Sequence, residues 1–205
     1  MKIAFATILV LGIMGGSLQR GQAAEDSPEA KSLRQEWKFI AINDDFRNRY
    51  IGSGNSLLRN KFISERAKQL REIIPTGHIT GWVGRVDHIN DAGGGYGSIA
   101  VSVDENIQVG TADTLLQEPS QWIDSMTSDL GGGAEKAVEG SLIDPKSQLY
   151  QKLLALRVGQ TIEFSGSFYP TNDGGIVDSN ILEENSVVKP FYKFKFESIS
   201  EKQQS

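Results

Sequence analysis

Cysteine is absent from this chain of 205 residues, and histidine occurs only at His78 and His88. Without cysteine there is no disulfide framework, thiol nucleophile, cysteine-ligated zinc, iron–sulfur cluster or lipid-modified cysteine. A straight strand between the two histidines would separate them by roughly 33 Å, too far for one metal ion or one catalytic proton. The sequence therefore predicts no metal and no other cofactor, and its stability has to come from a packed core.

Basic residues are also fewer than acidic ones. The chain has 21 Lys and Arg against 26 Asp and Glu, which gives a formal net charge of -5. Proteins that bind the phosphate backbone concentrate Lys and Arg on one face. The composition therefore excludes nucleic acid as an expected partner.

Long apolar runs are confined to the N-terminal region. The run over residues 3–14 is shorter than the roughly 20 residues of a membrane-spanning helix. Small residues at Gly21 and Ala23 suit signal peptidase, so we expect a signal peptide over 1–23 with cleavage after Ala23 or, alternatively, Ala24. An uncleaved anchor is the other interpretation. Cleavage would remove two basic residues, leaving a net charge of -7, and would place the protein in the periplasm or outside the cell without a membrane span.

The first part of the remaining chain has helical periodicity. Ser27, Pro28 and Glu29 form a helix-start signature, which predicts a helix over about 28–50. Apolar residues recur along it at helical spacing: Leu33, Trp37, Ile40, Ala41 and Phe46.

A second amphipathic stripe follows the break at 52–55 and ends at Pro75. The Gly-Ser-Gly-Asn break favours an antiparallel hairpin over one long interrupted helix. A charged group on the second helix is interpreted as a solvated face: Glu65, Arg66, Lys68 and Arg71.

From His78 onward, apolar residues alternate with period two, which indicates strands. Three strands are expected, at 78–88, 98–103 and 107–111. A long polar stretch with Gly131–Gly133 follows, and then Asp144 and Pro145 open a short helix that Gly159 ends. Two more strands are expected at 161–169 and 191–199, with an accessory hairpin around Ile176 and Ile181.

Three strands, a helix and two strands is the order of the five-stranded OB barrel, in which a helix lies between the third and fourth strands. We therefore predict an α+β protein: an N-terminal helical hairpin followed by an OB-like β-barrel. The predicted boundaries are a signal peptide at 1–23, a helical segment at 24–75, the OB-like domain at 76–200 and a disordered tail at 201–205.

Several motifs spread over most of the mature chain carry a family resemblance. They are Phe39, Phe46, Tyr50, Asn55, Arg66, Ala67 and Leu70; Trp82-Val83-Gly84; Leu142-Ile143-Asp144-Pro145 with Ser147 and Leu149; and Gly159-Gln160 with Phe164-Ser165-Gly166-Ser167-Phe168. In these the chain resembles uncharacterised exported bacterial proteins that join a helical segment to an OB-fold-like (tRNA-anticodon-binding-like) β domain. The resemblance implies the fold, and it brings no catalytic residue with it.

The loop between the first two predicted strands is the best candidate for a binding site, because binding residues concentrate on such loops. Its glycines lack the spacing and the lysine of a phosphate-binding loop. Gly94, Gly95 and Tyr96 are the candidates there, with Trp82 from the first strand. Trp82 is expected to pack on the barrel or at its junction with the helices, and it becomes a ligand candidate if its ring is exposed.

Nucleic-acid binding by an OB-like fold needs aromatic side chains beside a basic groove. The predicted second and third strands, over 98–104 and 107–111, contain no Lys, Arg or aromatic residue. The expected platform is therefore missing, in agreement with the acidic net charge.

No residue pattern singles out a catalytic group. Asp87, Asp91, Asp104 and Glu105 cluster at strand connections, without the alternating spacing of an EF-hand. Glycoside hydrolysis would need a facing pair of carboxylates, one of them desolvated, and no such pair can be assigned from the sequence. Ser165-Gly166 with Phe168-Tyr169 matches a short string of periplasmic lysozyme inhibitors.

We therefore interpret the chain as an exported, non-catalytic binding module for an unknown protein or envelope ligand. The alternatives are a cell-envelope hydrolase that uses carboxylates and a periplasmic enzyme inhibitor. A buried carboxylate with a raised pKa in a cleft would favour catalysis. An exposed rigid loop would favour inhibition.

Overall fold

The computed structural model describes residues 27–111, 140–171, 175–178 and 183–202. The predicted signal peptide, the polar stretch with Gly131–Gly133, Ile181 and most of the predicted tail lie outside these residues. The described chain is an α+β protein with four helices and a five-stranded mixed sheet. Within it, no helix has the length and apolar character that a membrane crossing requires.

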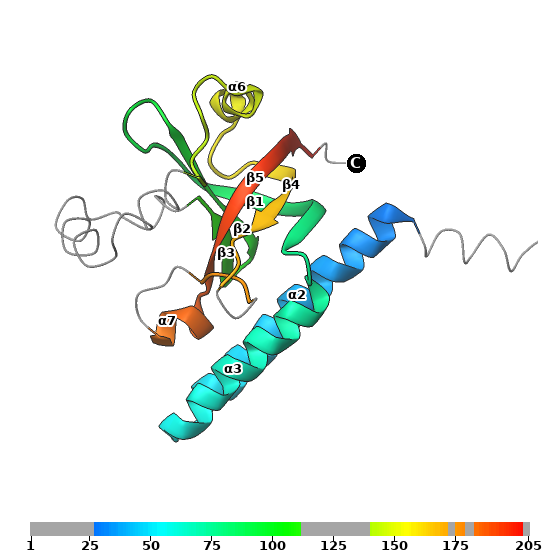
Figure 1. Cartoon of the computed structure of the whole chain (residues 1–205), viewed down its shortest axis with the longest axis vertical. Helices are drawn as coiled ribbons and strands as arrows, with labels where there is room; N and C mark the ends of the chain where they lie inside the picture. Colours follow the sequence, from blue (N-terminus) through cyan, green and yellow to red (C-terminus); the bar gives the residue numbers. More distant parts are fainter. Residues whose placement is uncertain (1–26, 112–139, 172–174, 179–182, 203–205) are drawn as a thin grey trace, which may run out of the picture.

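The first two described helices form the predicted antiparallel hairpin (Figure 1). They are α2 (Pro28–Ile51), capped by the Ser27 hydroxyl, and α3 (Ser56–Ile73), capped by the Asn55 side chain. Gln35 near the start of α2 donates from Nε2 to the carbonyl of Ile73 at the end of α3, at 2.8 Å. Because the start of one helix meets the end of the other, the helices run in opposite directions.

The sheet contains five strands: β1 (His78–Asp91), β2 (Gly97–Asp104), β3 (Ile107–Gly110), β4 (Thr161–Phe168) and β5 (Phe191–Glu201). Their hydrogen-bonded order is β1-β2-β3-β5-β4, and β4 pairs with β1, so the sheet closes on itself. Pairing is antiparallel except between β3 and β5, which run parallel. Glu201 pairs with Ile162, so β5 extends into the predicted tail.

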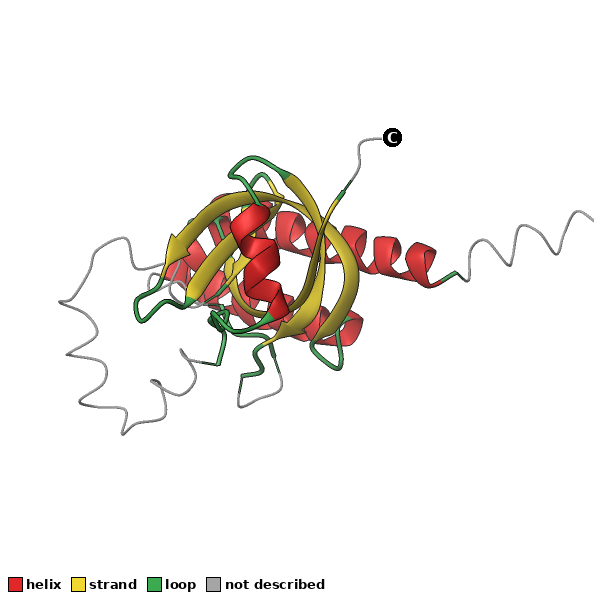
Figure 2. Ribbon diagram, turned by 90° about the horizontal axis from the view of Figure 1, so that it is seen from above, coloured by secondary structure: helices red, strands yellow, loops and turns green. Residues whose placement is uncertain are grey.

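Two shorter helices complete the described chain. Helix α6 (Gln148–Ala155) follows the Asp144-Pro145 turn and begins at the Ser147 cap. Figure 2 shows it across one opening of the closed sheet, with α2 and α3 on the opposite side. Helix α7 (Glu183–Val188), which the sequence did not predict, packs against α2. Of the predicted accessory hairpin, Ile181 lies outside the described residues, and Ile176 forms an isolated bridge with Pro170.

Aromatic side chains fill the junction between α2 and the sheet. The Phe39 ring lies 5.0 Å from Trp82, 5.6 Å from Phe168 and 5.1 Å from Tyr192, measured between ring centroids. All four side chains are buried. Trp82 therefore packs at the junction of sheet and helices, as the sequence predicted.

The face that α2 turns toward the sheet differs from the predicted one. Leu33 and Trp37 of the predicted stripe are 54% and 65% exposed. The residues of α2 that are buried are Glu36, Phe39, Asn43, Phe46 and Tyr50. Two polar residues occupy this buried face because each finds a partner there: Glu36 accepts from the Val83 amide, and Asn43 accepts from the Tyr192 hydroxyl.

The predicted solvated face of α3 also needs a correction, since Arg66 is only 5% exposed. Its guanidinium donates to the Ser186 carbonyl and lies 3.4 Å from an Asp178 carboxylate oxygen. A buried guanidinium requires such partners. Arg66 thus ties α3 to α7 and to the segment before it.

Candidate functional site

The described chain has a cleft of about 1060 Å³ between the first half of α2 and the beginning of β1. The end of α3 borders it at Glu72 and Ile73, and Glu163 of β4 and Lys202 complete the wall. The cleft therefore lies where the hairpin meets the closed sheet.

A bulge in β1 shapes the floor of the cleft. The register between β1 and β4 shifts between Ile79 and Trp82, and Gly81 has a φ of +66°, a conformation that favours glycine. Two side chains of α2 form hydrogen bonds to the backbone at and just after this bulge, Ser32 by donating to the Thr80 carbonyl and Glu36 by accepting from the Val83 amide.

Glu36 is the most perturbed acid of the cleft. Its side chain is 7% exposed, and both carboxylate oxygens lie 3.3 Å from the Val83 nitrogen. Burial raises the pKa of Glu36 from 4.5 to about 7, against the opposing effects of the Val83 hydrogen bond and the charge of Lys202. Near neutral pH this carboxyl group is therefore present in both protonation states.

A second acid, Glu163, lines the same cleft from β4 and is exposed. The cleft thus contains one desolvated carboxyl group and one solvated carboxylate. Sequence reasoning missed Glu36 because it took Leu33 and Trp37 as the buried face. The signal that could have found it is the helical spacing of Ser32, Glu36, Phe39 and Asn43.

His78 and two neighbours resemble a hydrolase triad in composition only. The Nδ1 atom of His78 lies 3.2 Å from Ser167 Oγ and 3.8 Å from Glu197 Oε2. The Ser167 hydroxyl can itself donate to Glu197, at 3.2 Å. In a working triad the serine and the acid occupy opposite ring nitrogens. Here both face the same nitrogen, so this geometry does not activate the serine.

The structure does not bring the predicted binding residues together. Trp82 is fully buried in the middle of the fold, which leaves its ring inaccessible to a ligand. Tyr96 is 40% exposed in the loop after β1, beside Gly94 and Gly95, whose φ angles are +61° and +83°. Backbone hydrogen bonds of 2.8 and 3.1 Å link Tyr96 to Ala92 and Gly93. Only the loop half of the predicted site is therefore open to a partner.

Asp87, one of the acids at the strand connections, has local partners. Asp87 accepts from the hydroxyl of Ser102 and from Gln108 Nε2, and pairs with Arg85 at 3.4 Å. Across the described ranges, no three His, Cys, Asp or Glu side chains are placed to hold a metal ion. The contacts of Asp87 therefore explain this acid as part of the sheet structure.

Gly166, in the string shared with lysozyme inhibitors, has a structural reason to be glycine. A Cβ atom at this position would lie 2.1 Å from the Lys195 carbonyl oxygen on β5. Close pairing of β4 with β5 therefore accounts for the residue without any role in inhibition.

Comparisons of the chain with protein-family models, with curated proteins and with solved structures find no match.

Proposed function

We propose that this chain is an exported, non-catalytic binding module built from a helical hairpin and an OB-like barrel, and that its ligand occupies the cleft between α2 and β1. The order of three strands, a helix and two strands supports the OB-like assignment. So do the return of β4 to pair with β1 and the position of α6 across one opening. The family resemblance of the sequence and its signal-peptide pattern support an exported protein with this architecture.

The cleft is the observation that carries the proposal. Its volume of about 1060 Å³ is just above the roughly 300–1,000 Å³ of small-molecule sites. One wall presents Lys31, Arg34 and Lys38 from α2, and the other presents His78 and Glu163. Charges of both signs around the apolar side chain of Leu33 suit a peptide or an envelope molecule with charged groups.

Affinity capture from an envelope fraction, with the mature protein as bait, tests this role. Leu33→Glu places an acid in the cleft, whereas Leu154→Glu makes the same change on α6, outside the residues that line the cleft. We expect a molecule that is retained by the parent and by Leu154→Glu, and lost from Leu33→Glu. Equal retention by all three baits would contradict a ligand site in the cleft.

We further infer that nucleic acid is not the ligand. The net charge is negative, and β2 and β3 carry no Lys, Arg or aromatic residue. A fluorescence-anisotropy titration with a labelled single-stranded oligonucleotide should give no saturable binding near physiological salt. Saturable binding that weakens as salt is added would reverse this inference, because phosphate contacts release counterions.

A second candidate function is carboxylate-dependent hydrolysis of an envelope polymer, and the raised pKa of Glu36 favours it. In this scheme Glu36 is the general acid and Glu163 the second carboxylate. Turnover of cell-envelope glycans by the parent, abolished in Glu36→Gln and in Glu163→Gln, would support the hydrolase. Absence of turnover in the parent would exclude this scheme for those substrates. No contact favours the third alternative, enzyme inhibition, over these two.

A further inference from the structure

The turn that joins α2 to α3 carries apolar side chains that the fold leaves in solvent. We call residues 47–62 the hairpin tip. Within it, Ile51 is 56% exposed, Leu57 78% and Leu58 44%. In Figure 1 the tip is the end of the hairpin that lies away from α6 and beyond the sheet. Three large aliphatic side chains are thus exposed at this end of the hairpin.

The same segment has a charge opposite to that of the rest of the chain. It contains Arg47, Arg49, Arg59 and Lys61 and no Asp or Glu. The whole chain has a net charge of -5, so the residues outside the tip carry -9. An anionic surface would therefore repel most of this protein and attract its tip.

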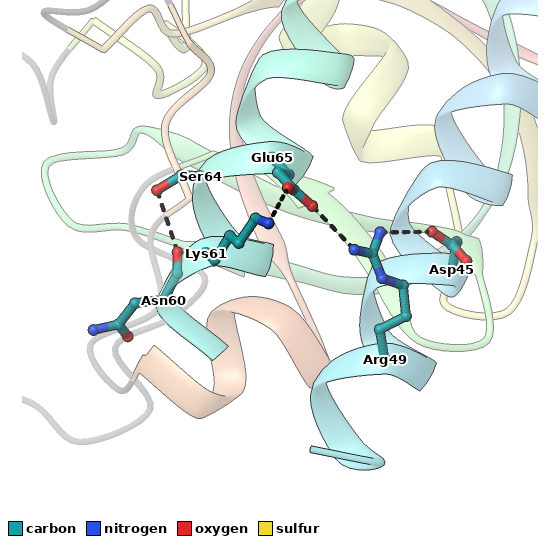
Figure 3. Close-up of polar contacts among 6 residues, drawn as sticks. All are labelled: Asp45, Arg49, Asn60, Lys61, Ser64 and Glu65. Atoms are coloured by element: carbon teal, nitrogen blue, oxygen red, sulfur yellow. Dashed lines mark hydrogen bonds and ion pairs between the residues drawn. The ribbon is translucent and has the colours of Figure 1, made fainter. Parts of the chain in front are cut away.

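The acids nearest to the tip are already paired with its cations. Arg49 lies 3.4 Å from Asp45 and 3.0 Å from Glu65, and Lys61 lies 3.6 Å from Glu65. Figure 3 shows this network bridging the two helices just behind the turn. Arg47 also lies 3.9 Å from Asp44, so the stretch from Asp44 to Glu65 keeps a net charge of +1, whereas the rest of the chain carries -6.

Arginine side chains lie over the aromatic rings at this end of the hairpin. The Arg49 guanidinium lies over the rings of Phe46 and Phe62, at 4.5 and 4.4 Å, and Arg59 lies 5.0 Å from the Tyr50 ring. Phe46 and Tyr50 are buried and fill the inner side of this end of the hairpin. The exposed aliphatic side chains therefore belong to a turn whose neighbouring aromatic rings are buried or covered by arginine.

We propose that the hairpin tip docks on the surface of an anionic lipid bilayer, with Ile51, Leu57 and Leu58 among the headgroups and the basic residues against the lipid phosphates. Aliphatic side chains flanked by Lys and Arg are the combination that binds anionic membrane surfaces. A lipid surface can deform around a protruding turn, whereas a folded protein would need a matching hollow, so the tip favours a lipid surface. Docking here leaves the cleft open and does not depend on the function proposed for it.

Co-sedimentation of the mature protein with vesicles tests the proposal. Vesicles of phosphatidylcholine that contain about one third phosphatidylglycerol should bind the protein, and binding should fall as salt screens the charges. Leu57→Glu with Leu58→Glu should weaken binding at least about tenfold, because it removes two apolar groups and adds two negative charges. The matched control is Leu154→Glu with Val158→Glu, which makes the same changes at two exposed residues near α6. The control should bind within about twofold of the parent.

A second pair of variants tests how much positive charge contributes to vesicle binding. Lys61→Gln should weaken vesicle binding about twofold to fivefold, since each basic residue near an anionic surface adds to the attraction. Lys146→Gln, also an exposed lysine, should leave it unchanged. Equal binding to pure phosphatidylcholine vesicles, or full binding by the double Leu variant, would overturn the proposal.

A fluorescence-quenching measurement with single tryptophan substitutions covers the case in which the double variant does not fold. Leu57→Trp should be quenched by brominated phosphatidylglycerol in the vesicles, and Leu154→Trp should not. Equal quenching at the two positions would contradict docking through the tip. If sedimentation instead showed a dimer that Leu57→Glu with Leu58→Glu dissolves, without vesicle binding by the parent, the tip would be a contact between copies and the proposal would be wrong.

Discussion

The two openings of the closed sheet are both covered by a helix, but the two covers are built differently. At one opening, α2 inserts Phe39 against Trp82, Phe168 and Tyr192, with Glu36 and Asn43 beside them on the same helix face. At the other, α6 brings Leu153 against the backbone at Gly97, which also bridges to Ile143.

An opening of the sheet can thus be closed with large side chains, or by packing a helix closely against a glycine. The α2 end depends on large rings and on polar groups that need partners. The α6 end depends on the missing side chain of Gly97, where an added Cβ would lie 2.5 Å from Leu153 Cδ2. Substitutions that shrink a residue should therefore damage the first end, and substitutions that enlarge one should damage the second.

Trp82→Ala should have the largest effect. The ring is fully buried against Phe39 and Phe168, so we expect a loss of about 3 to 5 kcal/mol in the free energy of unfolding, measured with denaturant. Trp37→Ala is the control on exposed α2 surface and should change stability by less than about 0.5 kcal/mol. Similar losses in the two variants would mean that the α2 end is not closed by these rings.

Gly97→Ala should cost about 1 to 3 kcal/mol at the α6 end, because the new methyl group overlaps Leu153 and lies 3.2 Å from Tyr150. In a double-mutant cycle the cost should shrink when Leu153 is already Ala. Additive losses in that cycle would show that the clash lies elsewhere.

Glu36→Gln should change how stability depends on pH. Burial raises the folded-state pKa from 4.5 to about 7, so the folded protein keeps a proton that the unfolded chain releases. The resulting stability is present in full below pH 4.5 and is lost as pH rises through 7. Above pH 8 the Gln variant, which retains an acceptor for Val83, should be more stable than the parent by roughly 1 to 3 kcal/mol.

This advantage should diminish toward pH 5 in unfolding curves recorded across the pH range. Glu163→Gln, at an exposed position in the same cleft, is the matched control and should show no such trend. A parent and a Glu36→Gln variant with parallel pH profiles would indicate that Glu36 is solvated.

Ser147→Ala should have the smallest effect of the four, about 1 kcal/mol, because it removes the hydroxyl that caps α6 by accepting from the Tyr150 amide at 3.1 Å. Gln148→Ala, one residue further along the same exposed turn, serves as control in thermal unfolding. An unchanged midpoint for Ser147→Ala would show that the α6 end is held by Leu153 and Gly97 without its cap.

The elements of the fold could largely be predicted from the sequence because their signals are local. Ser27 and Pro28 mark the start of α2, the glycines and Asn55 mark the turn, and period-two alternation marks the strands. Helix α7 was missed because a six-residue helix has too little periodicity to detect.

The candidate site could not be predicted in the same way, because its contacts join residues far apart in the chain. The buried Glu36 accepts a hydrogen bond from Val83, and the buried Asn43 accepts one from Tyr192. Arg66 likewise reaches Ser186 and Asp178. A helix that buries polar groups against distant partners has no simple apolar stripe, which is why Leu33 and Trp37 were taken for its inner face.

The position of β5 in the sheet affects the order in which the molecule can fold. This strand pairs with both β3 and β4, and it supplies the Tyr192 ring that packs on Phe39. In a growing chain that has not yet reached Phe191, β3 and β4 each have one edge without a strand partner. The aromatic junction is also incomplete. Closure is therefore a late, non-local event, and contacts of such long sequence separation slow folding. A nascent or truncated chain without β5 should bind chaperones and be cleaved by proteases that the complete protein resists.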